Sequence, residues 1–227
     1  MDRTSGRRGL LQLGTACALV LTTPVFARDA KKKAEDAISP PEDLMREHAI
    51  LDRILLIYES SMRRLGQGED IDPAVFVQSA TIMRDFIHAY HEKSEEELVF
   101  PRFKTAGRMV ELVNVLLTQH GAGRKLTERI LAAAPQARSR EPREAMGRDI
   151  QALVAMYRPH AAREETDLFP ALRQLVTSDE YEGIADEMEK RERQAFGADG
   201  FEKIAKKVAE IETVIGIHDL DVFTPKS

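Results

Sequence analysis

The chain has 227 residues, of which 43% are hydrophobic and 31% charged, so it can form one domain with a substantial core. Its formal net charge of −5 disfavours nucleic acid as a partner, because contacts to phosphates need clustered lysine and arginine. The single cysteine, Cys17, lies near the N-terminus, so the rest of the chain can form no disulfide and can hold a metal only through nitrogen and oxygen atoms.

Residues 1–27 have the pattern of an export signal. A basic start, an apolar run and a small-residue cleavage motif follow one another: Arg3, Arg7 and Arg8; Leu10 to Leu21; Val25-Phe26-Ala27. The adjacent arginines resemble the twin-arginine signal of bacteria, which exports folded proteins; an ordinary signal or an uncleaved anchor is the alternative. We expect cleavage after Ala27, a linker over residues 28–40, and a mature protein in the bacterial periplasm, with no membrane contact beyond export.

Four amphipathic helices follow, each with apolar residues at steps of three and four. Their expected limits are, in order: Pro40 to Gly66; Pro73 to a stop or kink before Pro101; residues 108–133; and, after a loop from Pro135 to Pro142, a helix that ends near Pro170. Short connections between amphipathic helices predict an all-α fold, an up-down antiparallel four-helix bundle over residues 41–172.

The C-terminal residues 173–227 are expected to form a helical extension of this bundle. Two further helices are predicted at roughly 178–194 and 200–215, separated at Gly197 and Gly200. Their apolar residues can pack along the bundle, and the extension contains no residue to which we assign chemistry.

One phrase occurs twice in the chain. Residues His91–Pro101 read H-x-x-x-E-E-x-x-V-F-P, and residues His160–Pro170 read H-x-x-x-E-E-x-x-L-F-P. On an α-helix, residues four apart lie on one face, one turn from each other. Each copy therefore presents a histidine nitrogen and a glutamate oxygen on the same helix face. Two such pairs facing each other across a bundle predict a metal site.

Two more histidines extend this pattern to all four helices. Alone, a histidine on an apolar face is usually a core residue with a backbone partner, and a buried glutamate usually pairs with a base. Ionised glutamates that are buried on helix faces without a lysine would lower the stability of the fold, and a metal ion offsets that free-energy cost. The candidate ligands are His48, His91, Glu95, His120, His160 and Glu164. Imidazole with carboxylate suits iron, manganese or zinc.

The spacing alone does not determine how these six residues share two ions. One assignment gives His48, His91 and Glu95 to the first ion. It gives the second ion the other three residues, which are His120, His160 and Glu164. Helix-bundle di-iron proteins use ligands that project inward from all four helices, as expected here.

The doubled phrase resembles the hemerythrin-like family, the HHE cation-binding domain, over about residues 41–172. The resemblance implies an up-down four-helix bundle with a non-haem centre of two iron ions that reacts with O2, NO or peroxide. Oxygen-carrying hemerythrins have a second third-helix histidine where this chain has Arg124, and an aspartate where it has Glu164. Four histidines with two glutamates look more like the di-iron proteins of bacterial iron–sulfur-cluster repair, whose cysteine-containing N-terminal domain has no counterpart here.

Several neighbouring residues have open roles. Glu92 is an additional ligand or a bystander, and His88 lies near the centre or on the surface. Glu96 and Glu165 are either solvated or hydrogen-bonded to ligand histidines. Arg124 either points outward or pairs with a glutamate.

The function expected from these residues is a di-iron protein that binds or senses O2 or NO outside the cytoplasm. A di-iron redox enzyme (an oxidase, peroxidase or NO reductase) is one alternative, for which no catalytic residue can be assigned. A metal-storage or structural helical protein, holding zinc for example, is another. The oligomeric state has no signal in the sequence.

Overall fold

A computed structural model describes residues 38–225, which form helices and turns without any strand. The expected export signal and all but the last three residues of the expected linker lie outside this range. The prediction of an all-α fold is confirmed for the described residues. Among them, no helix combines the length and the hydrophobicity needed to cross a membrane.

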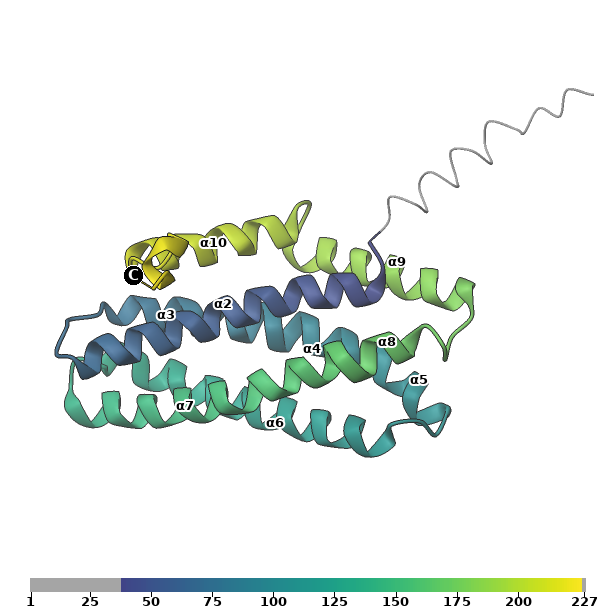
Figure 1. The fold of residues 1–227 in the computed structure, drawn as a ribbon, viewed down its shortest axis with the longest axis horizontal. Coiled ribbons are helices and arrows are strands. Elements are labelled where there is room, and N and C mark those ends of the chain that lie inside the picture. The colour runs from purple at the N-terminus through teal and green to yellow at the C-terminus, as the bar shows by residue number, and fades with distance from the viewer. Residues whose placement is uncertain (1–37, 226–227) are drawn as a thin grey trace, which may run out of the picture. The chain divides into compact units, whose positions relative to one another are not determined.

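Four long helical segments form a bundle (Figure 1). The first segment is α2 (Pro40–Gly66), and the second comprises α3 (Pro73–Ile82), η1 (Met83–His91), α4 (Glu92–Ser94), η2 (Glu95–Val99) and α5 (Phe100–Thr105). The third segment is α6 (Val110–Ala133) with η3 (Ala134–Gln136). The fourth comprises α7 (Arg140–Arg163), η4 (Glu164–Leu168) and α8 (Phe169–Leu172). In Figure 1, successive segments are joined at alternate ends of the bundle. The first and third segments each pack against both the second and the fourth.

Local sequence explains where the first two segments begin. The backbone N–H of Ser39 donates to the Glu42 carboxylate at 3.1 Å, and Pro40 follows where a missing N–H costs nothing. The second segment begins with Pro73 after Asp72, whose carboxylate accepts a 2.9 Å hydrogen bond from the N–H of Ala74.

Both copies of the doubled phrase contain a wide, π-helical turn. The N–H of Phe100 bonds to the carbonyl of Glu95, and the N–H of Phe169 bonds to that of Glu164, each five residues earlier. The proline after each phenylalanine has no N–H, and in an α-helix its ring would collide with the carbonyl four residues before it. The wide turn relieves this collision.

The helices therefore continue past the prolines. The second helix was expected to stop or kink before Pro101, and the expectation of a stop is wrong, because helical structure extends to Thr105. The fourth helix likewise passes Pro170 and ends at Leu172. Proline stands in the first turn of α5 and of α8, where its missing N–H has no α-helical acceptor to lose.

The additional C-terminal helices are present as α9 (Ser178–Phe196) and α10 (Gly200–Val214), followed by the short η5 (Leu220–Phe223). Gly197 separates the two helices with a φ of +80°, a backbone conformation that favours glycine. Both helices contact α2, and α10 also packs on α3 (Figure 1). Their inward apolar residues are buried: Ile184, Met188, Ile204, Val208 and Ile211.

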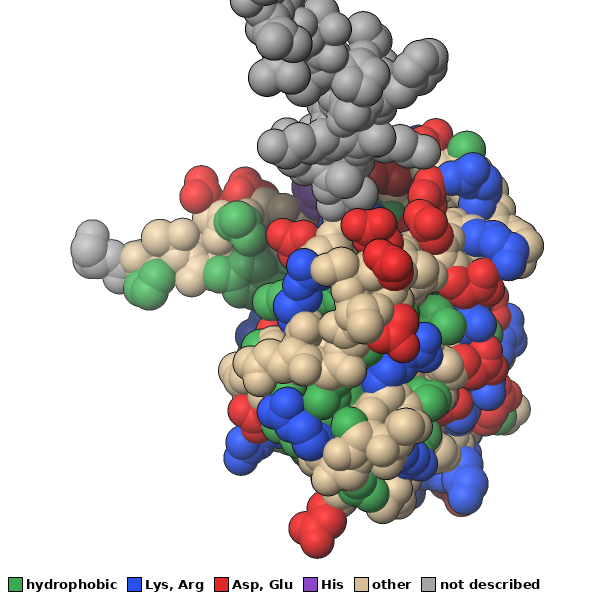
Figure 2. Space-filling model, turned by 90° about the vertical axis from the view of Figure 1, so that its right-hand side faces the viewer, with side chains coloured by type: hydrophobic (Ala, Val, Ile, Leu, Met, Phe, Trp, Pro, Cys, Tyr) green, Lys and Arg blue, Asp and Glu red, His purple; other side chains and the backbone are tan. Residues whose placement is uncertain are grey.

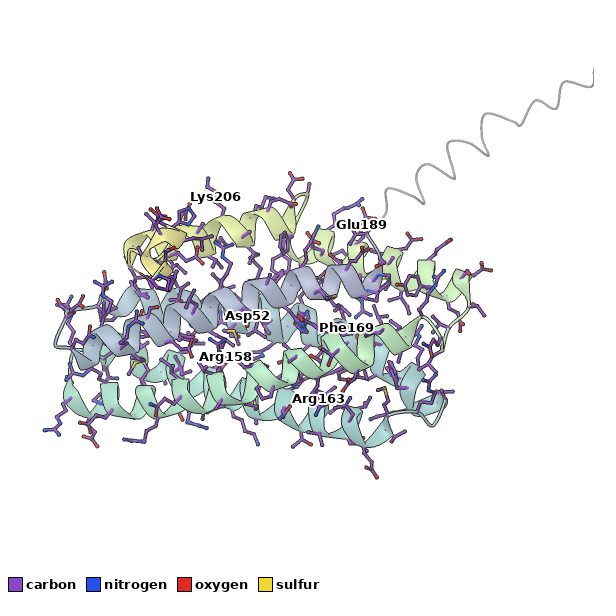
Figure 3. The ribbon with its side chains drawn as sticks, viewed as in Figure 1. Asp52, Arg158, Arg163, Phe169, Glu189 and Lys206 are labelled. Carbon is purple, nitrogen blue, oxygen red and sulfur yellow. The ribbon has the colours of Figure 1, made fainter. Side chains whose placement is uncertain are left out.

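Two apolar clusters fill the bundle, one toward each end. The larger includes Leu51, Ile87 and Leu153, and the smaller includes Leu44, Val99 and Leu168. Outer faces carry charged side chains that point away from the bundle, such as Glu189 and Lys206 in Figure 3. On the face shown in Figure 2, acidic and basic side chains are intermixed. Along each long segment, a candidate histidine falls between the two apolar clusters, so the polar site is a layer enclosed by hydrophobic packing.

Candidate metal centre

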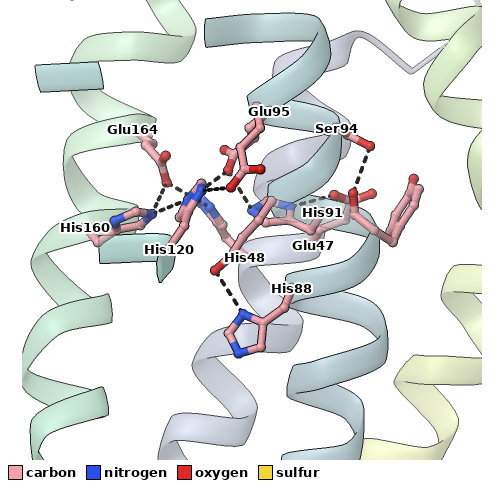
Figure 4. Close-up of polar contacts among 12 residues, drawn as sticks. Glu47, His48, His88, His91, Ser94, Glu95, His120, His160 and Glu164 are labelled. Carbon is pink, nitrogen blue, oxygen red and sulfur yellow. Dashed lines mark hydrogen bonds and ion pairs between the residues drawn. The ribbon is translucent and has the colours of Figure 1, made fainter. Parts of the chain in front are cut away.

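The six side chains singled out from the sequence converge in this buried layer (Figure 4). All six residues are between 0 and 4% exposed. They form two groups, and within each group the possible ligand atoms lie within 4.8 Å of one another. One group is His48, His91 and Glu95, and the other is His120, His160 and Glu164. These are the same two triads as in the assignment given above.

Each glutamate lies between histidines of different triads. Oε2 of Glu95 is 3.6 Å from Nε2 of His91 and 3.5 Å from Nε2 of His120. Oε2 of Glu164 is 3.1 Å from Nε2 of His160 and 3.4 Å from Nε2 of His48. The two carboxylates thus connect the two triads, the arrangement expected of carboxylates that bridge a pair of cations.

Five inner atoms of this cluster lack hydrogen-bond partners among the described residues, whereas Nε2 of His120 and Nε2 of His160 lie 3.2 Å apart. Neither carboxylate oxygen of Glu95 or Glu164 has one among the described residues, and Nε2 of His48 has none. A buried polar atom left in this state costs about 1–3 kcal/mol. Contact with a cation would offset that cost for all five atoms together. The imidazole and carboxylate donor set therefore fits a pair of divalent metal ions.

The outer nitrogen of each histidine, in contrast, is paired. Nδ1 lies within hydrogen-bond distance of a side-chain oxygen in all four cases: His48 with Glu165 at 3.0 Å, His91 with Glu47 at 2.6 Å, His120 with Glu96 at 3.1 Å, and His160 with Gln119 at 2.9 Å. Such pairing holds the ring orientation and leaves Nε2 to face the centre, as in metal-binding histidines.

A regularity underlies these pairs. Each partner is the sequence neighbour of one candidate ligand and serves a histidine on another helix. Glu165 follows Glu164 and contacts His48 of α2, and Glu47 precedes His48 and contacts His91. Of the alternatives above, Glu96 and Glu165 are hydrogen-bonded to candidate ligand histidines. The sequence reasoning missed Glu47 and Gln119, although their adjacency to His48 and His120 is a signal that finds them.

The family comparison agrees with this geometry. Residues 39–172 match the family described as the Hemerythrin HHE cation binding domain. The chain belongs to the hemerythrin HHE family. The match covers the bundle with all six converging side chains and ends at Leu172, the last residue of α8.

The similarity of this HHE protein to its relatives extends beyond the bundle. Three uncharacterized proteins, one from Mycobacterium bovis and two from strains of Mycobacterium tuberculosis, are each 41% identical to it over 233 residues. The similarity covers 97% of this chain and 91% of each relative, so it includes the C-terminal helices. No solved structure matches the chain.

The two HHE glutamates differ in their electrostatics. Burial, together with the nearby charge of Glu164, raises the pKa of Glu95 well above its usual value. Glu164 is equally buried, but His160 and His48 hold the pKa of its carboxyl below the usual value. Without a cation, the environment thus favours the protonated form of Glu95 and the ionised form of Glu164. Because carboxylate ligands must be deprotonated, metal binding here would release a proton from Glu95.

A second polar cluster lies beside the HHE centre. His88 and Glu92 are buried, and they contact each other at 3.0 Å. Arg124 reaches both Glu92, at 2.8 Å, and Glu96, at 2.5 Å. Arg124 therefore pairs with glutamates, and His88 is not a surface residue. Tyr157, which the sequence reasoning did not single out, donates a 2.6 Å hydrogen bond to Glu92.

Proposed function

We propose that this HHE domain binds two iron ions and uses them to bind or sense O2 or NO outside the cytoplasm. The observation that carries the proposal is the set of five buried, unpaired inner atoms, on Glu95, Glu164 and His48, between the two triads. The ligands would be His48, His91, Glu95, His120, His160 and Glu164. Manganese or zinc suits the same donors.

Bound iron would supply a redox-active centre that coordinates small diatomic ligands. The chain's own residues would hold the centre in place and shield it from water. Four outer acceptors orient the imidazoles, and the two glutamates connect the two metal positions. The apolar layers on both sides, with Phe100 and Phe169 stacked on His120 and His48, exclude bulk water. An enclosed site of this kind favours a ligand of two or three atoms over a larger substrate.

The first experiment measures metal content and the visible spectrum of the purified protein, followed by titration with O2 and with NO. We expect two irons per chain and a visible spectrum that changes reversibly with the gas. A colourless protein with zinc, or with no metal, would contradict the proposal and favour a structural or storage role. Turnover of peroxide or NO that is lost in His120→Ala would replace the sensor or carrier with a redox enzyme.

The location is tested separately by cell fractionation. If residues 1–27 are a twin-arginine signal, the wild-type protein is periplasmic and shorter by this segment. The variant Arg7→Lys/Arg8→Lys then stays in the cytoplasm at full length. A cytoplasmic wild-type protein would contradict the export proposal without affecting the metal proposal.

A further inference from the structure

Glu92 is chemically equipped to be a metal ligand but lies in a different environment from Glu95 and Glu164. It is 1% exposed and directly follows His91. The carboxylates of Glu92 and Glu96 and the ring of His120 form a third group, whose possible ligand atoms lie within 4.8 Å of one another. His120 belongs to this group and to one of the two triads, so the third group borders the candidate metal centre.

Unlike the glutamates of the centre, Glu92 is held by protein groups from three helices. Its Oε1 accepts from Tyr157 of α7 at 2.6 Å and lies 3.0 Å from Nδ1 of His88. Its Oε2 lies 2.8 Å from a guanidinium nitrogen of Arg124 on α6, as an ion pair without hydrogen-bond alignment. Arg124 also contacts Glu96, so its positive charge already stands between the two acids of the third group.

The backbone is shaped to admit this arrangement. A Cβ atom on Gly123 would lie 1.9 Å from the hydroxyl oxygen of Tyr157, so only glycine lets Tyr157 lie this close to α6. His88 is fixed from its other side, where Nε2 lies 2.8 Å from the hydroxyl of Thr127. A glycine inside a helix costs roughly 1 kcal/mol relative to alanine, and here it provides the space for one hydroxyl group.

We infer that Tyr157, Arg124 and His88 form a clamp that keeps the Glu92 carboxylate out of the metal centre. In this inference, which rests on the proposed metal binding, Tyr157 and Arg124 are positioning residues. Arg124 takes the place of a cation between Glu92 and Glu96, and the metal is directed to the triads. An ion held by His120 would then not have Glu92 as a ligand, which would leave room for a small ligand.

The test releases Glu92 by Tyr157→Phe or, separately, by Arg124→Gln in the full chain. The matched control is Tyr58→Phe, because the Tyr58 hydroxyl is also buried but has no hydrogen-bond partner within residues 38–225. Zinc dissociation constants of the metal-free proteins are measured by chelator competition. Visible spectra and NO dissociation constants are measured on the iron-loaded proteins.

We expect the releasing variants to bind zinc at least about tenfold more tightly, because one more carboxylate becomes a ligand. Their iron spectra should shift and NO should bind at least about tenfold more weakly, since Glu92 then occupies the room left for a small ligand. Adding Glu92→Gln to Tyr157→Phe should restore the wild-type values, and Tyr58→Phe should show them throughout.

Two results overturn the clamp while leaving the proposed function intact. One is a pair of releasing variants that match the wild type in zinc affinity and spectrum. The other is a change in Tyr157→Phe that persists after Glu92→Gln is added, because Glu92 would then not be its cause. A wild-type protein that binds neither zinc nor iron would instead overturn the proposed function itself.

Discussion

The two copies of the doubled phrase are alike at their glutamates but opposite in electrostatics, and only the first copy follows a longer π-helical stretch, Met83–His91. His91 with Glu95, and His160 with Glu164, share their spacing, their burial and a π-helical turn at the glutamate. Yet burial raises the pKa of Glu95, whereas the histidines around Glu164 lower its pKa. The repeated residues determine where the donor atoms lie, and their neighbours determine the charge.

The neighbours differ in one respect, the number of acids. Glu95 is close to Glu92, Glu96 and Glu47, all of which raise its pKa further. The outer nitrogen of His91 faces the carboxyl group of Glu47, whose pKa burial raises to about 8, whereas that of His160 faces the amide of Gln119. If the centre binds metal as proposed, we therefore expect the two copies to contribute unequally to its affinity. Four experiments bear on this contrast, in order of expected effect.

Removing either glutamate should weaken metal binding strongly, with unequal consequences for the stability of the metal-free protein. Glu95→Gln and Glu164→Gln should each weaken metal binding at least about 100-fold, because a bridging ligand is lost. In the metal-free state, Glu95→Gln replaces a carboxyl group whose pKa is raised, and it should change the unfolding free energy by under about 1 kcal/mol. Glu164→Gln removes a charged partner of two histidines and should cost about 1.5–3 kcal/mol. Denaturant unfolding checks both, and equal costs would contradict the contrast.

Exchanging the outer partners should narrow the difference between the copies. Glu47→Gln gives His91 an amide partner like that of His160, and it should weaken metal binding about tenfold, within the range for outer hydrogen-bond partners. Gln119→Ala should have a smaller effect, because the contact of Gln119 with His160, at 2.9 Å, is longer than the 2.6 Å contact of Glu47 with His91. Metal titrations of the two variants make the comparison. A larger loss in Gln119→Ala would show that Glu47 is not the stronger outer partner.

The acid-rich surroundings of the first copy should make the metal-free protein sensitive to pH. Burial and the nearby Glu47 raise the pKa of Asp43 from 3.8 to about 7. A raised pKa in the folded state gives stability that is complete below pH 3.8 and is lost as the pH rises to about 7. Allowing for partial exposure, we expect a loss of about 1–2 kcal/mol over this window, and a smaller one in Asp43→Asn. Unfolding midpoints that rise with pH in this window would contradict the assignment.

The smallest effect is expected from the exposed ion pair in the second copy. Arg163 contacts Asp167 at 2.8 Å, one helical turn away, and both side chains are accessible to solvent. Arg163→Ala should change the unfolding free energy by under about 1 kcal/mol and leave the metal affinity unchanged. Calorimetry and metal titration check this. A change in metal affinity would mean that surface charge contributes to the difference between the copies.

The sequence predicted the parts of this molecule that depend on periodicity. Helical spacing identified the four long segments and placed His48, His91, His120 and His160 on inward faces, and the structure brings them together. It did not reveal the contacts that depend on how helices are rotated against each other. Tyr157 reads as an ordinary core aromatic until its hydroxyl is found opposite Gly123 and Glu92.

The error at the prolines has a different physical origin. Pro101 was expected to stop or kink a helix, because a proline removes a hydrogen bond and collides with a carbonyl. In the structure the chain widens one turn instead, at Glu95–Val99, and the helix then continues. Whether a chain ends its helix or widens a turn depends on the tertiary packing of the residues beyond, here Phe100 and Phe103 in the smaller apolar cluster.

The wide turns also limit how the doubled phrase can vary in length. A π-helical turn holds one residue more than an α-helical turn, and an α-helix rotates about 100° per residue. Deleting one residue between Glu95 and Phe100 would restore regular α-helical hydrogen bonding and turn every following side chain away from its present contact. Phe100 would then no longer stack on His120 and cover the candidate metal centre. The phrase thus tolerates exchanges at its variable positions but no insertion or deletion, and aligned copies of it should contain no gaps.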